Sequence, residues 1–403
     1  MLGDEGSEET RQRGVVGPTS AIVCGAGIAG LAVAGELGRA GWNVTVLEQA
    51  PARREQGYMI DFFGPGFGAA EEMGLLERLR ELAYDIDVVC FVDEHGRERE
   101  IDYRLVASAQ DGRLISLMRP DLELALFERL PDAVTVRFGA TVDSVSDGAD
   151  AATVRLADGS THVADVVIGA DGVHSGVRGA LFGAEATPLR PLGFHTCAFT
   201  FHDPQLHEWL GTRWYLTDTM NRMAGCYALR DGRVAFFGAH EASGPAPPDA
   251  RAALLTAYAQ LGEPTDRALA HCPPPAELYY DMVAQVELPR WSSGRVCLVG
   301  DACQAVSLLA GQGASLAVAG GRLLARELLR PAPHVEAFRS YETRWRPVVE
   351  EKQEAGRRAA STFLPRSRYE LLIRRMGLRL LQWPVVGRLI SARLVGTRSS
   401  AGR

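Results

Sequence analysis

One segment near the amino terminus limits the fold more than any other part of the chain. Residues 21–24 are apolar, as expected of a strand buried on both faces. Residues 25–30 follow directly and have the spacing GxGxxG, and residues 31–39 favour a helix. Residues 42–47 predict a second strand, which ends at Glu48, about twenty residues beyond the glycines. This order predicts the βαβ unit of an α/β fold.

The glycines and the acid each meet a physical requirement of a dinucleotide site. Gly25 permits a tight turn, and Gly27 has no side chain, so a pyrophosphate can approach the backbone. Gly30 lets the helix pack closely on the strand, and the helix amino terminus offers free N–H groups to phosphates. Glu48 can accept hydrogen bonds from a ribose. A Gly-rich turn without a ligand is the alternative, but all the expected neighbours stand in the expected order.

Composition excludes several classes of protein. The 403 residues suffice for about two or three domains, and the formal charge of −7 argues against a nucleic-acid binder. The seven cysteines are scattered without a C-x-x-C pair, which favours reduced thiols in the cytoplasm and no metal site. Residues 14–35 and 302–321 carry no charge, but both are rich in Gly and Ala and coincide with glycine motifs. We therefore predict no membrane span, and we expect residues 1–19 to be a disordered tail.

The rest of the chain predicts a split organisation. Many aromatic residues, short alternating runs and turn signals between residues 186 and 285 predict an antiparallel sheet. The pattern of a buried strand then returns at 295–299. We expect a Rossmann-like nucleotide-binding domain interrupted by a substrate-binding domain with an antiparallel sheet, followed by a helical region. The expected ranges are 20–85, 114–185 and 286–335 for the first, 86–113 and 186–285 for the second, and 336–403 for the third.

Two further glycine-rich segments place polar groups at the ends of predicted strands. Asp171 follows one apolar run, although a solvated turn would explain this residue equally well. Asp301 follows the predicted strand 296–299, where its carboxylate could accept hydrogen bonds from sugar-like hydroxyls. Residues 311–313 precede a predicted helix over 314–324, whose amino terminus could stabilise a negatively charged group.

Together these segments resemble one family. Residues 21–329 resemble the class A FAD-dependent monooxygenases, the aromatic hydroxylases typified by para-hydroxybenzoate hydroxylase. Residues 59–66 also resemble the branch that contains tetracycline-modifying monooxygenases. The matching motifs, in the order of the family, are GxGxxG with Glu48, Arg119-x-x-Leu122-x-x-x-Leu126, Asp171-Gly172-x-x-Ser175-x-x-Arg178 and Gly300-Asp301.

The resemblance implies bound FAD and a transient reductant, NADPH or NADH, that docks on the FAD domain. It implies that Arg119 lies near the phosphates and that Asp301 binds the ribityl chain. In this family a flavin C4a-hydroperoxide passes oxygen to an electron-rich carbon, so the implied partners are O₂ and a polycyclic aromatic or polyketide-like small molecule. The residues expected at the cofactor are Gly25, Gly27, Ile28, Ala29, Gly30, Glu48, Gln49, Arg53, Arg119, Asp171, Gly300, Asp301, Gly311, Gln312, Gly313 and Ala314.

Departures from the family motif leave other functions open. Gln304 and Leu308 stand where the family usually has His and Pro, and the carbonyl of that Pro lies close to the flavin. This departure motivates an alternative, a redox-neutral cyclase or isomerase that keeps FAD. A non-catalytic flavin-binding regulator also stays open, whereas a flavin-dependent halogenase would need a Trp-x-Trp-x-Ile-Pro segment, which is absent. No acid–base pair is visible, and Gln304 and Gly311 are only weak catalytic candidates.

The substrate pocket and the carboxy terminus are less constrained. Phe62, Trp214 and Tyr215 are weak candidates for an apolar substrate pocket, with ordinary packing as the competing explanation. The basic region after residue 366 has Leu371 and Met376 at helical spacing with other apolar residues. We expect a helix that packs back across both domains, with a helix on a membrane surface as the alternative. Monomer and dimer both stay open.

Overall fold

The predicted βαβ unit forms the centre of the nucleotide-binding part of the molecule. The computed structural model describes residues 19–104, 110, 112–183, 189–307 and 311–381. Strand β1 (Ser20–Cys24) pairs in parallel with β2 (Asn43–Glu48), and α1 (Ile28–Arg39) connects them. Residues 1–18 of the predicted tail and Leu308 lie outside the described residues.

Four more strands extend this pair into a six-stranded sheet with the order β17-β18-β11-β1-β2-β7. All neighbouring strands are parallel except β17 and β18. The apolar strand sequences are explained by burial on both faces, since β1, β11 and β18 are almost completely buried. The added strands are β7 (Val134–Phe138), β11 (Val166–Gly169), β17 (Ser292–Ser293) and β18 (Val296–Leu298).

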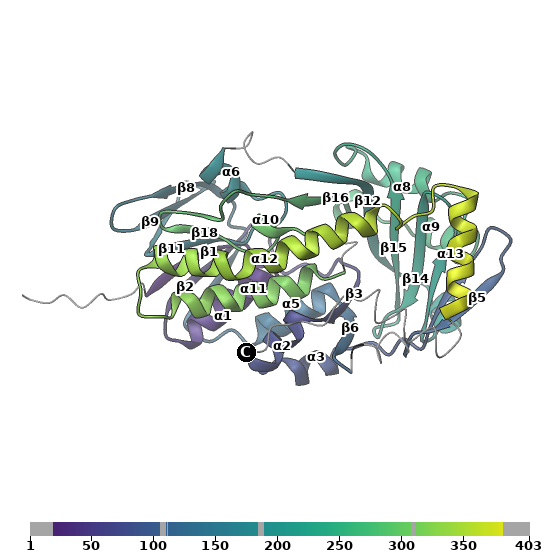
Figure 1. Ribbon diagram of the computed structural model, residues 1–403, viewed down its shortest axis with the longest axis horizontal. Helices are drawn as coiled ribbons and strands as arrows, with labels where there is room; N and C mark the ends of the chain where they lie inside the picture. The colour runs from purple at the N-terminus through teal and green to yellow at the C-terminus, as the bar shows by residue number, and fades with distance from the viewer. Residues whose placement is uncertain (1–18, 105–109, 111, 184–188, 308–310, 382–403) are drawn as a thin grey trace, which may run out of the picture.

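Helices and two small sheets surround this sheet (Figure 1). Helix α11 (Gly313–Leu328) packs against α1 and α2, and α12 (His334–Ala360) lies over α11. A two-stranded ribbon of β3 (Met59–Phe63) and β6 (Leu114–Met118) leads toward the other half of the molecule. The remaining elements of this half are α2 (Pro65–Glu72), α3 (Leu76–Glu81), α5 (Arg119–Glu128), β8 (Val142–Asp147), β9 (Ala152–Leu156), β10 (Thr161–Ala164), α6 (Gly176–Phe182) and α10 (Asp301–Gln304).

The second half is a seven-stranded sheet with the order β16-β12-β15-β14-β13-β4-β5. It is antiparallel except for β13 and β4, which pair in parallel. Its strands are β4 (Val88–Val92), β5 (Glu98–Asp102), β12 (Leu189–His202), β13 (Arg213–Thr217), β14 (Arg222–Ala228), β15 (Arg233–Glu241) and β16 (Tyr279–Val286). The α/β class with an inserted sheet is thus confirmed, whereas the exact domain boundaries stay a prediction.

The two faces of the seven-stranded sheet pack against different elements. One face carries the core beneath α7 (Pro204–Leu210), α8 (Ala250–Tyr258) and α9 (Thr265–Ala270). The short helix η1 (Pro275–Glu277) follows α9 in the chain. The other face contributes to a core shared with the β3–β6 ribbon. Because side chains alternate along a strand, neighbouring residues of this sheet belong to different cores.

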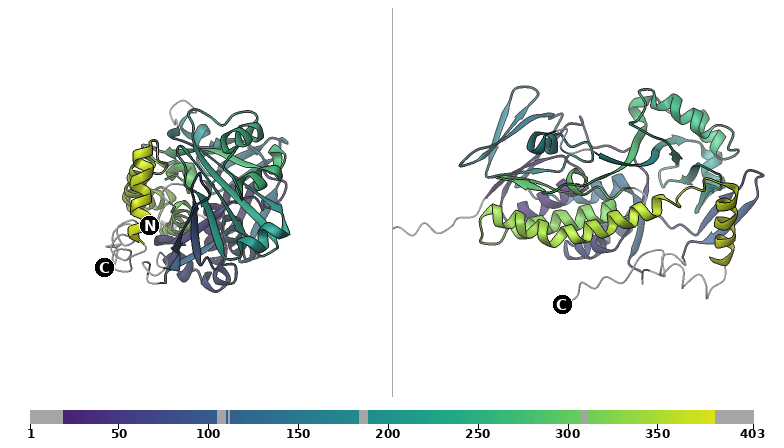
Figure 2. Two further views of the ribbon diagram at one scale, coloured as in Figure 1. Left: turned by 90° about the vertical axis from the view of Figure 1, so that its right-hand side faces the viewer. Right: turned by 45° about the horizontal axis from the view of Figure 1, so that its top comes forward.

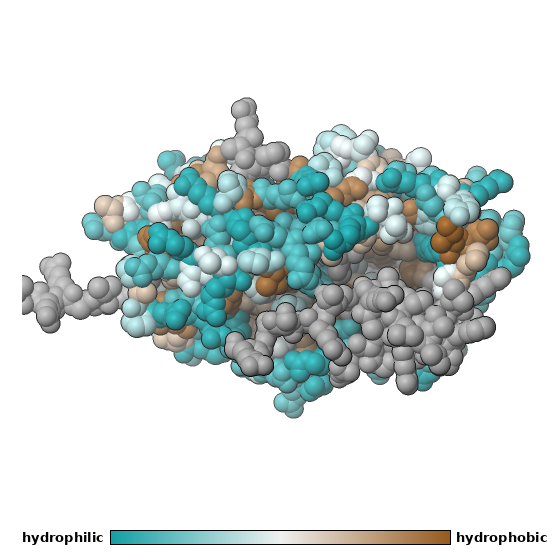
Figure 3. All heavy atoms as spheres, in the orientation of Figure 1, coloured by the Kyte–Doolittle hydropathy of each residue, from teal (hydrophilic) through white to brown (hydrophobic). Residues whose placement is uncertain are grey.

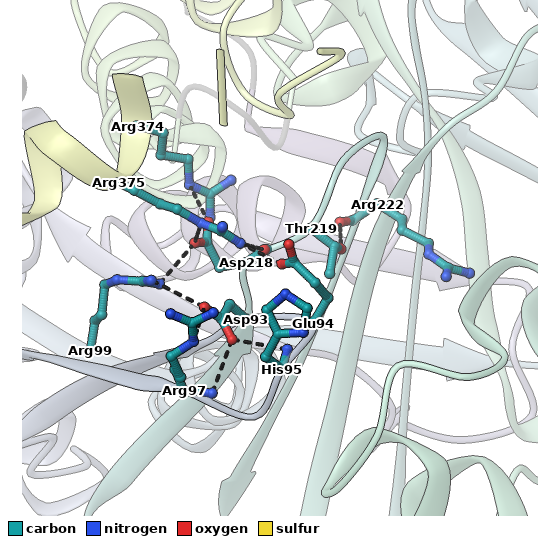
Figure 4. A network of polar contacts seen from close by, with 10 residues as sticks. All are labelled: Asp93, Glu94, His95, Arg97, Arg99, Asp218, Thr219, Arg222, Arg374 and Arg375. Carbon is teal, nitrogen blue, oxygen red and sulfur yellow. Dashed lines mark hydrogen bonds and ion pairs between the residues drawn. The ribbon is translucent and has the colours of Figure 1, made fainter. Parts of the chain in front are cut away.

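The carboxy-terminal helix α13 (Arg368–Leu381) stands beside the seven-stranded sheet, away from the six-stranded one (Figure 2). It is held by the buried carboxylate of Asp218, which is 2.7 Å from Arg375 and 3.5 Å from Arg374 (Figure 4). Arg99 of β5 completes the network at 3.3 Å from Asp218. In the described part, α13 therefore packs beside one sheet and not across both domains, and it is held by this charged network and by the buried Leu371.

The outer face of α13 is apolar. Figure 3 shows a hydrophobic patch at this end of the molecule, where Leu372, Ile373 and Met376 are about half exposed. Tyr369 is more exposed still. Among the described residues, no helix combines the length and the apolar character needed to cross a membrane.

Candidate functional site

A cavity of about 380 Å³ lies between the two large sheets and is lined from both sides. From the six-stranded side it is lined by the start of α1, the loop after β11, Asp301 and the start of α11. From the other side it is lined by one face of the seven-stranded sheet and by β3. The segments that the sequence separates by hundreds of residues therefore meet at one place.

The glycine loop has the close packing that its sequence predicts. Gly25 has φ +110°, and a Cβ there would lie 2.4 Å from the Ala170 carbonyl oxygen. A Cβ on Gly30 would lie 2.0 Å from the Gly25 carbonyl oxygen, so only glycine allows α1 to begin here. Gly300 similarly brings the end of β18 against α1, since its Cβ would lie 2.6 Å from that of Ala29. These three glycines bring the chain segments together, whereas Gly27, which lines the cavity, leaves open space.

Glu48 holds the glycine loop in place. Its carboxylate accepts a hydrogen bond from the backbone N–H of Ala26 at 2.9 Å and another from that of Ala50 at 2.9 Å. The acid at the end of β2 is thus tied directly to the turn at the end of β1, and it is only half-buried. Gln49, the next residue, is exposed. Contact of Glu48 or Gln49 with a ribose stays a prediction.

Two helix amino termini open into the same cavity. Ile28 and Ala29 begin α1, and Gly313 and Ala314 begin α11. Neither helix has a side-chain cap at its amino terminus or an acidic residue in its first turn. Both termini therefore present a partial positive charge to the cavity, which suits the pyrophosphate at one and a negatively charged ring system at the other. On this observation the cavity fits FAD.

Charged side chains stand near these termini. Arg119, at the start of α5, lines the cavity and lies 3.0 Å from Glu123. The same carboxylate raises the pKa of Arg119, so the guanidinium stays charged. Burial raises the pKa of Asp301, while the charge of Arg119 opposes this shift. Asp281 of β16 adds a further carboxylate to the lining.

The second motif braces the loop after β11. The Asp171 carboxylate accepts hydrogen bonds from Ser175 Oγ at 2.5 Å and from the N–H of Val177 at 3.0 Å. Arg178 donates to the Ala302 carbonyl oxygen at 3.0 Å, which links this loop to the third motif. Gly172 lines the cavity, but Asp171 does not. The motif therefore shapes the loop, and a direct contact of Asp171 with FAD stays a prediction.

Two buried glutamines hold the segment 305–307, which also lines the cavity. Gln285 Nε2 donates to the Val306 carbonyl oxygen at 3.0 Å and to the Gln353 carbonyl oxygen at 2.8 Å. Gln353 Nε2 donates to the Ala305 carbonyl oxygen at 3.1 Å and to that of Val286 at 2.7 Å. Because Gln353 lies on α12, this long helix fixes a wall of the cavity.

The remaining cofactor residues that were predicted, and the catalytic candidate Gln304, lie at different places. Gly311 lines the cavity, whereas Gln304 and Gln312 are buried and do not line it. Gln304 Nε2 donates to the Leu316 carbonyl oxygen at 3.3 Å, so this side chain turns toward α11. Arg53 donates to the Pro120 carbonyl oxygen and lines a separate cleft. Of these four residues, only Gly311 is therefore placed where it could touch a ligand in the cavity.

Of the three aromatic residues expected at the substrate, one lines the cavity and two do not. Trp214 lines the cavity, but Tyr215 points to the opposite face of the sheet, where its ring stacks on Trp209. Phe62 is fully buried in the core of the nucleotide-binding half and does not line the cavity, although Asp61 and Phe63 do. Strand alternation explains why Tyr215 faces away from the cavity that Trp214 lines, because adjacent side chains of a strand face opposite sides.

The sequence did not point to most of the substrate-side wall. Its members come from β3 and the residue before it, from five strands of the seven-stranded sheet and from the segment after α12. The residues of this wall that were not predicted are Tyr58, Met59, Ile60, Asp61, Thr196, Leu216, Met223, Tyr227, Phe237, Tyr279, Asp281, Met282, Val283, Ala284 and Phe363. Only the alternation of apolar residues in strands could have indicated some of them.

One group of potential metal ligands occurs among the described residues. Cys90, Glu98 and Glu100 have ligand atoms within 4.8 Å of one another. Burial raises the pKa of Cys90 to about 12, so its thiol is protonated at neutral pH. The two carboxylates are exposed, and we assign no metal to this group.

Comparisons with known proteins agree with this geometry. A family model described as an FAD binding domain matches residues 18–354. The chain is 33% identical over 342 residues to the Mycobacterium tuberculosis (strain ATCC 25618 / H37Rv) protein named "Uncharacterized protein Rv1260", covering 82% of this chain and 91% of that protein. It is 29% identical over 349 residues to a "Flavin-dependent monooxygenase" of an unknown prokaryotic organism, covering 85% and 90%. Among solved structures, tetracycline destructase Tet(51) superposes with a TM-score of 0.80 at 24% identity, covering 94% of this chain and 100% of that one.

Proposed function

Because the chain belongs to the class A FAD-dependent monooxygenases, we propose that it uses NADPH or NADH and O₂ to hydroxylate or epoxidise an electron-rich, polycyclic aromatic or polyketide-like molecule. One observation carries this proposal. A single cavity joins the two helix amino termini, which suit FAD, to a largely apolar wall of the seven-stranded sheet. A cofactor and a ring-shaped substrate can therefore lie side by side in it.

The chain offers distinct groups to each part of FAD. The N–H groups of Ile28 and Ala29 and the charge of Arg119 would hold the pyrophosphate, and Asp301 would accept hydrogen bonds from the ribityl chain. Bound FAD would supply the transfer of electrons from the nicotinamide and the activation of O₂. The amino terminus of α11 stabilises negative charge placed next to Gly313.

The substrate-side wall would orient the substrate and exclude water. Met59, Trp214, Met223 and Phe237 line it, and they come from β3 and three strands of the seven-stranded sheet. Aromatic and methionine side chains bind flat apolar rings through dispersion and area burial, and methionine adapts to irregular ring shapes. Water excluded in this way strengthens the electrostatic interactions at the reacting atoms.

A redox-neutral cyclase or isomerase is the second candidate. Two carboxyl groups, Asp61 and Asp281, line the cavity and could transfer protons in such a reaction. Gln304 does not face the cavity, so the residue that replaces the family's usual His offers no polar group there. Both observations are compatible with a reaction in which protons are transferred and no oxidation takes place.

One experiment separates the two functions. Purified protein loaded with FAD is incubated with NADPH or NADH and a panel of polycyclic phenols, in air and under nitrogen. The masses of the products are then determined by mass spectrometry. A monooxygenase gives substrate-dependent NAD(P)H oxidation in air and a product heavier by one oxygen atom. An isomerase gives a product of unchanged mass under nitrogen. A protein that does not retain FAD would overturn both.

A further inference from the structure

Asp61 is a carboxyl group at the wall of the cavity without a cationic partner. It lies in β3, between Ile60 and Phe62, and it lines the cavity together with Ile60 and Phe63. Within the part of the chain that the structure describes, no Arg, Lys or His side chain forms an ion pair with Asp61. A carboxylate in such a place costs free energy unless something compensates for it.

The protein supplies two neutral donors to this carboxyl group. Ser116 Oγ, on the paired strand β6, donates to Asp61 Oδ1 at 2.7 Å. The Tyr103 hydroxyl lies 3.4 Å from Ser116 Oγ and also bonds to the carboxyl group. Burial raises the pKa of Asp61, and the bonds from Tyr103 and Ser116 oppose that rise. Because an ionised carboxylate has about four acceptor positions, two donors leave it capacity for a ligand.

Among the described residues that line the cavity, no basic side chain is available to pair with Asp61. Arg119 is the only basic residue that lines it among the described residues, and Arg119 is paired with Glu123. Around Asp61 the wall is made mostly of apolar side chains, such as Met59 and Phe63. A substrate that fills the cavity therefore meets a hydrogen-bond acceptor of full or partial negative charge within an apolar wall.

From this arrangement we propose that Asp61 is the polar anchor of the substrate and accepts a hydrogen bond from an N–H or O–H group on its ring system. The inference rests on the proposed function for the statement that the occupant is the substrate. Two kinds of donor share this chemistry, a protonated amine and a phenolic or enolic hydroxyl. An anionic substituent at the same position is disfavoured because two negative charges would then share an apolar site.

Binding measurements with three probes on one ring test the inference. FAD-loaded protein is titrated by calorimetry with 1-naphthylmethylamine, 1-naphthol and 1-methoxynaphthalene, which offer a cationic donor, a neutral donor and no donor. The test variant is Asp61→Asn, which keeps an acceptor for Ser116 but removes the charge. The control variant is Asp85→Asn, which removes the same charge at an exposed position. Calorimetry needs no NAD(P)H and no turnover, so the result is independent of whether the protein oxygenates anything.

We expect the wild-type protein to bind the amine or the naphthol more tightly than the methoxy compound. Asp61→Asn should lower the affinity for the amine by about tenfold or more, because hydrogen bonds to charged groups contribute about 1.5–3 kcal/mol. It should weaken the naphthol less, since the amide oxygen still accepts, and it should leave the methoxy compound within about twofold. A selective loss for the amine identifies a cationic substrate, and a selective loss for the naphthol identifies a hydroxylated one.

Two results would overturn the inference. One is equal affinity of wild type and Asp61→Asn for all three probes, with unchanged FAD content and melting temperature. The other concerns the wild type alone and needs no variant that folds. If the methoxy compound binds at least as tightly as both donors between pH 5 and pH 9, no anchor of this kind exists. A failure of the proposed function would instead appear only in the NAD(P)H and product assays.

Discussion

His174 and Asp281 join the two halves of the molecule, with His174 Nε2 at 3.0 Å from Asp281 Oδ1. His174 lies in the loop after β11, and Asp281 lies in β16 of the other large sheet. The Asp281 side chain lines the cavity, whereas that of His174 is 62% exposed. The pair therefore connects the cavity wall to a solvent-exposed imidazole, and its strength depends on pH.

The first prediction concerns this pH dependence. The hydrogen bond that His174 donates to the Asp281 carboxylate raises the pKa of His174 above its usual 6.5. The charged pair therefore stabilises the folded state most below that value. The contribution is lost as the pH rises through the folded-state pKa. Thermal melting should therefore separate wild type from His174→Gln at pH 5.5 and not at pH 9. A difference in melting temperature that is the same at both pH values would contradict this prediction. His95→Gln, at an exposed position, serves as the control.

The second prediction concerns Gly30. A methyl group there would lie 2.0 Å from the Gly25 carbonyl oxygen, so Gly30→Ala must push α1 away from the glycine loop. We expect a loss of about 1–3 kcal/mol in unfolding free energy and loss of bound FAD, measured by urea denaturation and flavin absorbance. Gly179→Ala is the matched control, because nothing lies within 4 Å of its Cβ in α6. That variant should keep FAD and wild-type stability, and equal losses in both would refute the steric argument.

The third prediction concerns Gln353. Gln353→Leu removes the donor to the carbonyl oxygens of Val286 and Ala305 and leaves both acceptors buried. We expect a destabilisation of about 2–4 kcal/mol and a larger fall in kcat than in FAD affinity, because residues 305–307 line the cavity. Glu354→Gln, the exposed neighbour on α12, should behave as wild type. An unchanged kcat in Gln353→Leu would show that α12 does not position this wall.

The fourth prediction concerns His240, beneath α8. Its ring nitrogens lie 2.9 Å from the Tyr258 hydroxyl and 3.2 Å from that of Tyr280. Burial, together with the charge of His195, lowers the pKa of His240 to about 4. The unfolded chain binds a proton at higher pH, so stability should fall as the pH drops from about 6.5 to about 4. Urea unfolding at several pH values should show a shallower fall for His240→Gln, and parallel profiles would contradict the assignment.

The fifth prediction concerns the network that holds α13 (Figure 4). Asp218→Asn leaves Arg99, Arg374 and Arg375 without the buried carboxylate that they share. We expect a cost of about 3 kcal/mol and faster proteolysis within α13, measured by melting and by timed digestion. Asp231→Asn, which removes one half-exposed pair with Arg233, should cost less than about 1 kcal/mol. Equal rates of cleavage in both variants would exclude Asp218 as the anchor of α13.

The sequence predicts the parts of the site that depend on neighbours along the chain. Gly25, Gly30 and Glu48 lie within one βαβ unit, so their spacing alone fixes their geometry. The amino terminus of α11 could be predicted for the same reason, because Gly311 to Gly313 directly precede an alanine-rich helix. These predictions required no knowledge of how distant segments meet.

The substrate side could not be predicted in this way. Asp61 and Asp281 become parts of one cavity only because β3 of the two-stranded ribbon and β16 of the seven-stranded sheet both line it. Trp214 and Tyr215 are both aromatic and adjacent in sequence, so only the register of β13 decides which of them lines the cavity.

The glycine motif also does not indicate how Glu48 holds the loop. Its carboxylate accepts a hydrogen bond from the N–H of Ala26.

The burial of the cysteines has a consequence for a protein that handles dioxygen. All seven thiols are buried, and burial raises the pKa of each of Cys24, Cys197 and Cys297, so none presents a thiolate to an oxidant. Methionine sulfur needs no ionisation to react, and Met376 of α13 is 55% exposed. Oxidative damage during turnover should therefore form methionine sulfoxide, first at Met376 of α13. The number of titratable thiols in the folded protein should stay constant.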